Sequence, residues 1–192
     1  MATQLFPDFH VIIVPGLHDS SPEHWQSRWH RRHPEFSRVR QDDWSNPQLS
    51  AWAARLGQVR HTDPTSANPR PCLLVAHSFG CLTAVHSIAR EADNVAGVLL
   101  VAPADPEKFA VSDLLPALPL PCPAIMVRSS NDPWMRADSA AQWAKRWGCE
   151  LEEGGAVGHI NADSDLGDWQ RGMGLLRRLA EKAHNRQLAF SA

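Results

Sequence analysis

The sequence predicts one α/β domain, residues 1–192, in which about six mostly parallel strands are covered by helices on both faces. Short apolar runs rich in β-branched residues alternate with segments whose apolar residues recur at helical spacing, as in βαβ units. The most apolar run, residues 72–76, is typical of a central strand covered on both faces. A length of 192 residues with 43% hydrophobic content suits one domain with a substantial core.

Six strands are expected along the chain. The first is a β-branched run, residues 10–16, which ends at Pro15-Gly16, and the second, residues 37–41, is weak. The remaining four are residues 72–76, 95–103, 124–130 and 149–155. Because the carboxyl ends of parallel strands share one edge of a sheet, functional side chains are expected at that edge.

Helices are expected between these strands. The first has Ser21 as its N-cap and Pro22 at its first helical position, and Trp25 and Trp29 share one of its faces. The expected helices are residues 21–33, 46–59, 79–92, 136–148 and a last one that begins near residue 165. Residues 103–123 carry six prolines and predict a long irregular connection, too short for a separate lid domain.

Composition excludes several classes of function. The formal charge of −2 is spread along the chain, with no basic stripe of the kind that binds nucleic acid. No run approaches the roughly 20 apolar residues that span a membrane, and the N-terminal segment lacks the pattern of a signal peptide. The four scattered cysteines show no CxxC spacing, so reduced cysteines and a cytoplasmic location are expected. No phosphate loop, dinucleotide fingerprint or convincing metal-ligand spacing is present, so neither cofactor nor metal is expected.

Ser78 lies where the most apolar strand gives way to a helix, in the frame Ala76-His77-Ser78-Phe79-Gly80. This frame is the G-x-S-x-G nucleophile elbow with alanine at its first position. A sharp strand-to-helix turn forces such a serine into a strained conformation with its hydroxyl exposed, and small residues two before and two after it let strand and helix pass closely. The motif alone is weak, and a serine that simply caps the helix is the alternative.

Two later strand ends offer the acid and the base that a nucleophilic serine needs. Asp132 follows the fifth strand in a loop fixed by Pro133, and His159 lies in a glycine-rich loop before the last helix. Taken alone, Asp132 is also explained by a turn at Asn131-Asp132-Pro133, and His159 by a loop position without a role. Their joint occurrence in the order serine, acid, histidine, each past a strand end, predicts a triad with Ser78 and hence a serine hydrolase.

The predicted oxyanion hole consists of two backbone N–H groups. One belongs to Phe79, directly after the nucleophile and at the start of a helix. The other is expected from the loop after the first strand, where Gly16 lets the backbone approach the substrate and Leu17 is the predicted donor. Two side chains are predicted to contact the substrate, His18 in the same loop and Trp134 in the loop of the acid.

With these residues identified, the chain resembles the α/β-hydrolase superfamily, and more narrowly the small serine hydrolases grouped with retinoblastoma-binding protein 9 and YdeN. The similar stretches extend over nearly the whole chain: VPGLHDSSPEHWQSRW, DDWSNPQLSAWAARL, VAHSFG, SSNDPW and GHIN. The resemblance implies a compact three-layer α/β-hydrolase fold without a separate lid domain, with Ser78, Asp132 and His159 as its triad. The chain departs from the most common elbow motif at its first position, where Ala76 stands in place of glycine.

The expected reaction is carboxylesterase-like hydrolysis of ester-like bonds in small acyl substrates through an acyl-enzyme. Nothing in the sequence indicates a protein partner. Two alternatives stay open. One is a non-catalytic protein-binding module that kept the fold, and the other is an acyltransferase that uses the same triad with an alcohol or amine in place of water. Ester, thioester and amide substrates all fit this triad.

Overall fold

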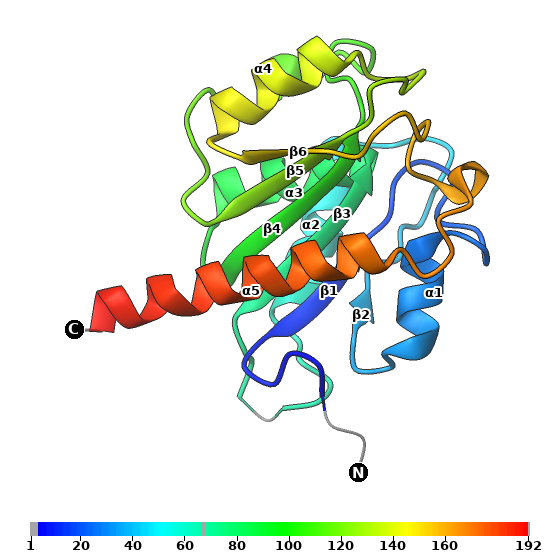
Figure 1. The fold of residues 1–192 in the computed structure, drawn as a ribbon. Coiled ribbons are helices and arrows are strands. Elements are labelled where there is room, and N and C mark those ends of the chain that lie inside the picture. Colours follow the sequence, from blue (N-terminus) through cyan, green and yellow to red (C-terminus); the bar gives the residue numbers. More distant parts are fainter. Residues whose placement is uncertain (1–3, 67, 192) are drawn as a thin grey trace.

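A six-stranded sheet forms the centre of the molecule (Figure 1). The computed structural model describes residues 4–66 and 68–191. Neighbouring strands are parallel throughout, in the order β2-β1-β3-β4-β5-β6, so the predicted parallel sheet is confirmed. The strands are β1 (His10–Val14), β2 (Ser37–Arg38), β3 (Cys72–Ser78), β4 (Val95–Pro103), β5 (Ala124–Arg128) and β6 (Glu150–Glu153).

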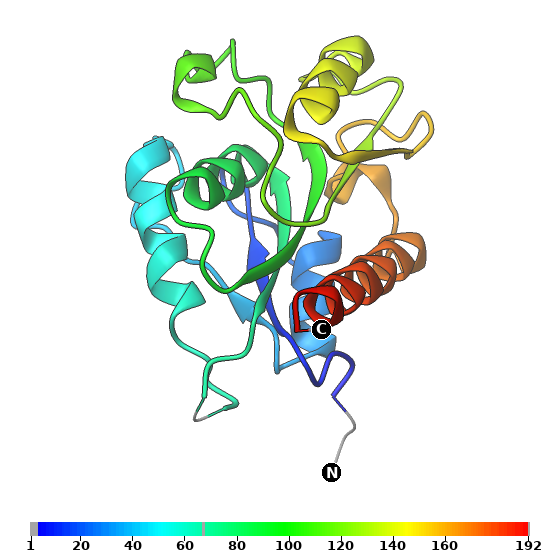
Figure 2. The ribbon, with the colours of Figure 1, turned by 90° about the vertical axis from the view of Figure 1, so that its left-hand side faces the viewer.

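Helices cover both faces of the sheet and make three layers, as predicted. The helices are α1 (Trp25–Arg32), α2 (Leu49–Arg60), α3 (Phe79–Arg90), α4 (Ala137–Trp147) and α5 (Gln170–Ser191), with short 3₁₀ turns at Ser112–Leu114 and Ala162–Ser164. Figure 2 shows α2 and α3 on one side of the sheet and α5 on the other. Alternate residues of β1, β3, β4 and β5 point into two separate cores, one shared with α2, α3 and α4 and the other with α1 and α5.

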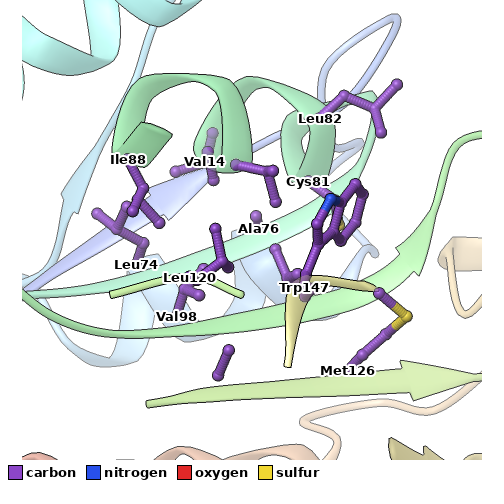
Figure 3. Packing of buried hydrophobic residues seen from close by; sticks show 14 of the residues in the cluster. Val14, Leu74, Ala76, Cys81, Leu82, Ile88, Val98, Leu120, Met126 and Trp147 are labelled. Carbon is purple, nitrogen blue, oxygen red and sulfur yellow. The ribbon is translucent and has the colours of Figure 1, made fainter. Parts of the chain in front are cut away.

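The larger core lies between the sheet and the helices α2, α3 and α4 (Figure 3). Ala76 and Leu74 of β3 lie there under Cys81 and Ile88 of α3, and all four are at most 1% exposed. Trp147 of α4 closes the same core and is also 1% exposed. Full burial of such side chains, at about 1.5 to 3 kcal/mol each for the large ones, supports the strand and helix that carry Ser78.

The strand order reverses between β1 and β3. From β1 the chain steps outward to β2, and it then returns to the other side of β1 before continuing through β4, β5 and β6. In open parallel sheets the crevice for a ligand forms at such a reversal, outside the carboxyl ends of the strands. The loop that follows β1 and the residues that follow β3 therefore flank the place where a site is expected.

Two predicted element boundaries are wrong. Residues 21–24 form a turn closed by a hydrogen bond from His24 N to Ser21 O at 3.0 Å, so α1 begins at Trp25 and its N-cap is His24 in place of Ser21. The last helix begins at Gln170 and not near residue 165, because Asp165 and Trp169 both have positive φ angles that a right-handed helix excludes.

The second strand is shorter than predicted. It pairs with β1 only at Ser37 and Arg38, because β1 ends at Val14 and is followed by Pro15, which has no N–H to donate. The prediction for residues 103–123 is confirmed, since this connection is irregular apart from one 3₁₀ turn and forms no lid domain. Within the described ranges, no helix is long and apolar enough to cross a membrane.

Candidate active site

Ser78 has a strained backbone, as the elbow prediction requires. Its φ of 54° and ψ of −125° lie in a region that non-glycine residues rarely adopt. The serine precedes α3, yet its side chain makes no capping hydrogen bond to that helix. The alternative of a simple helix cap is therefore wrong, and the hydroxyl is left available for another partner.

Two glycines allow the close packing around the elbow. A Cβ added at Gly80 would lie 2.3 Å from the carbonyl oxygen of Val14, so no larger residue fits between α3 and the end of β1. A Cβ added at Gly16 would lie 2.7 Å from the Cβ of Ser78 and 3.2 Å from the backbone N of Phe79. The loop after β1 therefore passes directly over the nucleophile elbow, as the sequence predicts for a loop that supplies an oxyanion donor.

Ser78, His159 and Asp132 form a continuous hydrogen-bonded chain. Nε2 of His159 lies 2.9 Å from Oγ of Ser78, and Nδ1 of His159 lies 2.8 and 3.0 Å from the two carboxylate oxygens of Asp132. A carboxylate only accepts, so Nδ1 carries the hydrogen and Nε2 is free to accept from the serine hydroxyl. The side chain of Asp132 is 2% exposed and that of His159 is 10% exposed. The three side chains that the sequence pairs are thus in contact.

The loops that carry the acid and the base are tied to each other. Oδ1 of Asp132 also accepts from the backbone N–H of Trp134 at 2.9 Å, so the turn expected at this position coexists with the bond to His159. Oδ1 of the neighbouring Asn131 accepts from the N–H of Gly158 at 2.7 Å. These bonds fix the separation of the two loops and hence the contact between acid and imidazole.

Two side chains that the sequence analysis did not single out hold the backbone of the histidine loop. Nε2–H of His77 donates to the carbonyl oxygen of His159 at 2.9 Å. Nε1–H of Trp25, on α1, donates to the carbonyl oxygen of Ile160 at 2.8 Å. His77 stands next to the serine in the elbow motif, which was the only signal for it, and its partner is 82 residues away in the chain.

A cluster of neutral histidines lies beside the triad. The ring of His77 lies 4.6 Å from that of His24 and 4.9 Å from that of His159, measured between centroids. Burial, then the positive charge of Arg38, lowers the pKa of His24 to about 3. Burial also lowers the pKa of His77 well below its usual value. Both rings are therefore neutral near pH 7 and add no positive charge next to the imidazole of the triad.

The two predicted oxyanion donors are the backbone N–H groups of Phe79, whose N lies beside Gly16, and of Leu17, which follows Gly16 in the chain. The two N–H groups that follow Leu17 already have backbone acceptors. That of His18 donates to the carbonyl of Trp44, in the segment between β2 and α2, at 2.9 Å, and that of Asp19 donates to the carbonyl of Gly16 at 3.1 Å. Within the described ranges the N–H of Leu17 has no such partner. Phe79 is the first residue of α3, so its N–H lacks an acceptor within the helix.

A cleft of about 630 Å³ opens above Ser78, and we call it the acyl cleft. Leu17, His18 and Trp134 line it, so the two side chains predicted to contact the substrate, His18 and Trp134, both border this cleft. Ala104 and Phe109 of the β4–β5 connection add apolar wall. Trp134 is 59% exposed, and its carbonyl accepts from Nζ of Lys108 at 2.7 Å, which links the two apolar sides of the cleft.

Comparison with known proteins identifies the family. The chain matches the serine hydrolase family over residues 11–178, and it belongs to that family. A putative YdeN-like hydrolase from Pectobacterium atrosepticum is 40% identical, with a TM-score of 0.82 over 92% of this chain and 91% of that one. The resemblance to YdeN-like members of the α/β-hydrolase superfamily is thereby confirmed, and the chain is a hydrolase of this fold.

More distant structures share the fold. The ydeN gene product of B. subtilis is 18% identical, with a TM-score of 0.70 over 90% of this chain and 99% of that one. Est1E from Butyrivibrio proteoclasticus, in a structure with bound ferulic acid, is 14% identical, with a TM-score of 0.67 over 90% of this chain and 88% of that one. No curated protein matches this chain.

Proposed function

We propose that this serine hydrolase cleaves ester bonds of small acyl substrates, with Ser78 as nucleophile, His159 as general base and acid, and Asp132 as the group that orients the imidazole. The observation that carries the proposal is the unbroken chain of hydrogen bonds from Asp132 through His159 to Ser78, at the floor of an open cleft. Geometry of this kind, and not a sequence position, defines a catalytic triad.

In the proposed reaction, Oγ of Ser78 attacks the ester carbonyl while Nε2 of His159 takes the hydroxyl proton. The C–O bond to the alcohol breaks next, and the same nitrogen returns the proton to the departing oxygen, which leaves an acyl group on Ser78. A water molecule then attacks this ester with His159 again as the base, and the acid product leaves. Asp132 stays ionised throughout and stabilises the transient imidazolium.

The negative charge that develops on the carbonyl oxygen during the attack is stabilised by two backbone hydrogen-bond donors. The N–H groups of Leu17 and Phe79 are the proposed pair, and the close approach of Gly16 to Ser78 and to the backbone N of Phe79 supports this assignment. Loss of one such donor in related enzymes costs about 2.7 to 4 kcal/mol of transition-state stabilisation.

The shape of the acyl cleft supports small or flat acyl groups. Its volume of about 630 Å³ is in the range of small-molecule sites. Phe109 and Trp134 offer apolar and aromatic surface, and no inserted domain covers them. We expect acetyl and short aromatic esters to be turned over faster than long-chain ones. Transfer of the acyl group to an added alcohol instead of water would redefine the protein as an acyltransferase with the same residues.

The decisive experiment is labelling of the purified protein with a fluorophosphonate probe, followed by hydrolysis of p-nitrophenyl acetate. The wild type should be labelled and active, whereas Ser78→Ala and His159→Ala should be neither. Ser50→Ala, which removes an exposed serine on α2, is the matched control and should behave like the wild type. Absence of labelling in a folded wild type would overturn the proposal and favour a binding module.

A further inference from the structure

A second hollow lies on the other side of the loop between β1 and α1, and it differs in charge from the acyl cleft. Its volume is about 550 Å³. The residues that matter for its chemistry are Asp19, His30, Arg31, Arg38, Arg40 and Gln41, and we call the hollow they line the basic groove. It is enclosed by the end of α1, the segment after β2 and the loop after β1.

The basic groove gathers positive charge in a protein whose formal net charge is −2. Arg38 is engaged by the carboxylate of Asp19, the one acid among the groove's lining residues. Arg31 is exposed and donates Nη1–H only to the carbonyl of Pro22 at 2.7 Å. Arg40 is exposed, and in the described part of the chain no carboxylate pairs with it or with Arg31. Arg31 and Arg40 therefore line the groove with N–H donors that no carboxylate of the described residues accepts.

A buried donor without a partner lies in the same groove. The side chain of Gln41 belongs to a residue that is 9% exposed, and its Nε2 has no hydrogen-bond acceptor within the described ranges. An unpaired buried amide costs free energy, so such groups normally have a partner. Gln41 lines the groove, so a turn of its side chain would bring this donor to an oxyanion bound there. The positive charges of Arg38 and Arg40 also reach His30, whose pKa is lowered by burial first and by these two charges next.

The basic groove and the acyl cleft share a wall. Asp19 lines both, and Ser20 lies on the groove side while Ser21 lies on the cleft side. The loop that carries the proposed oxyanion donor Leu17 therefore continues directly into the rim of the groove. A substrate that crosses this rim would place one end at Ser78 and the other among the arginines.

We propose that the basic groove binds a phosphate group of a substrate whose ester lies at Ser78, so that the physiological substrates are phosphorylated acyl esters. The substrate assignment rests on the proposed function above. A phosphate fits better than a carboxylate, because its three oxygens and near-double charge can accept from the guanidinium groups of Arg31 and Arg40 at the same time. The groove thereby gives a role to two arginines that have no carboxylate partner within the described ranges.

The kinetic test compares acetyl esters of ω-phosphorylated alkanols, in a series of chain lengths, with the same esters that lack the phosphate or carry a carboxylate instead. For at least one chain length, kcat/KM of the wild type should favour the phosphorylated ester by about tenfold, which corresponds to about 1.4 kcal/mol. In Arg31→Gln/Arg40→Gln this preference should fall to about one. A stronger preference for the carboxylate would overturn the phosphate assignment.

The control variant is Arg90→Gln/Arg177→Gln, which removes two exposed positive charges elsewhere. Arg90 ends α3, whose first residue adjoins Ser78, and Arg177 borders a hollow formed with the residues that precede β1. The phosphate preference should survive in this variant. If it falls as far as in the groove variant, general electrostatic attraction explains it and the site proposal is wrong.

A binding measurement separates failure of the groove from failure of the hydrolase. Calorimetric titration of Ser78→Ala with inorganic pyrophosphate should show binding that weakens at least tenfold when Arg31→Gln and Arg40→Gln are added. If esters are turned over without a phosphate preference and pyrophosphate does not bind, the proposed phosphate site is wrong and the proposed triad is still supported. Arginine-dependent pyrophosphate binding without turnover of any ester keeps the anion site and overturns the hydrolase. Pyrophosphate binding with equal turnover of all esters overturns the role in substrate binding.

Discussion

At the amino-terminal end of the strands, Arg60 is fully buried and uses its guanidinium donors completely. It donates to the carbonyl oxygens of Glu91 and Asp93, to Oγ of Ser87 at 3.0 Å and to the side chain of Asn94. At the carboxyl-terminal end, the hydroxyl of Ser78 makes no structural hydrogen bond to its helix. The hydroxyl instead hydrogen-bonds to Nε2 of His159, an imidazole nitrogen that can accept its proton.

Backbone strain divides the two ends in the same way. His18, Asp19, Ser78 and Ile160 all have positive φ angles, between 48° and 64°, and all lie beside the acyl cleft or within its loops. At the opposite end the positive φ next to Arg60 belongs to Asn94, a residue type that tolerates it. The buried Arg60 and its surroundings therefore combine satisfied hydrogen bonds with tolerated backbone geometry, whereas the end proposed to perform the chemistry combines backbone strain with a serine hydroxyl that does not cap its helix.

The largest expected effect is on the acid of the triad. Asp132→Asn should lower kcat by about 10⁴-fold, because the amide can donate to Nδ1 of His159 and so favours the wrong tautomer. The free energy of unfolding should change far less. Steady-state kinetics with p-nitrophenyl acetate measures the loss, and Asp42→Asn, at an exposed acid paired with Arg55, is the control. A loss below tenfold would mean that another group orients the imidazole.

The second prediction concerns the loop over the elbow. Gly16→Ala should lower kcat about 10²- to 10³-fold, because the new methyl group would meet the Cβ of Ser78 and displace the oxyanion donors. Gly57→Ala is the matched control, since a Cβ there meets nothing within 4 Å. That control should keep full activity and gain about 0.5 to 1 kcal/mol of stability as a helical alanine. Full activity in Gly16→Ala would contradict the assignment of Leu17 as a donor.

The third prediction tests the opposite end of the sheet. Arg60→Met should lower the free energy of unfolding by about 3 kcal/mol, because it leaves the carbonyl oxygens of Glu91 and Asp93 and the side-chain oxygen of Asn94 without this donor. The kcat of the folded fraction should stay near that of the wild type. Urea unfolding measures the effect, and Arg55→Met on the same helix should cost less than about 1 kcal/mol, as an exposed ion pair does. Loss of kcat in Arg60→Met would contradict the claim that the amino-terminal end of the sheet contributes to stability and not to activity.

The smallest effect is pH-dependent. His24 has a folded pKa of about 3 and an unfolded pKa near 6.5, so its neutral form stabilises the fold fully above pH 6.5. This contribution is lost as the pH falls from 6.5 toward 3, at up to about 1.4 kcal/mol per pH unit. His24→Asn keeps a side chain that can cap α1 but removes the titration.

Urea unfolding of both proteins at several pH values measures this difference. The stability of the wild type relative to His24→Asn should be constant above pH 7 and should decrease with acidification below pH 6.5. Other titrating groups are common to both proteins and cancel in the comparison. A difference that does not change with pH would show that His24 is not held neutral in the folded state.

Sequence patterns predicted the strands, the layers and the residues that meet at the candidate site. The elbow at Ser78 and the order of Asp132 and His159 could be predicted because each follows an expected strand, of which those before Ser78 and Asp132 are apolar. The hydrogen bonds from His77 and Trp25 to the histidine loop could not be predicted from the sequence, because the carbonyl groups that accept them lie far away in the chain. The start of the last helix was missed for a different reason, because it depends on the positive φ angles of Asp165 and Trp169, which the residue types do not announce.

The conformation of Ser78 has a consequence for the order in which the chain folds. A residue with this backbone geometry costs about 1 to 3 kcal/mol, and it persists only when its surroundings enforce it. The end of β1 must already lie against Gly80, and His159 must arrive from 81 residues further along the chain. In the proposed triad, Ser78 of a growing polypeptide therefore has no base until the C-terminal third has folded, and esterase activity would report that the whole domain has formed.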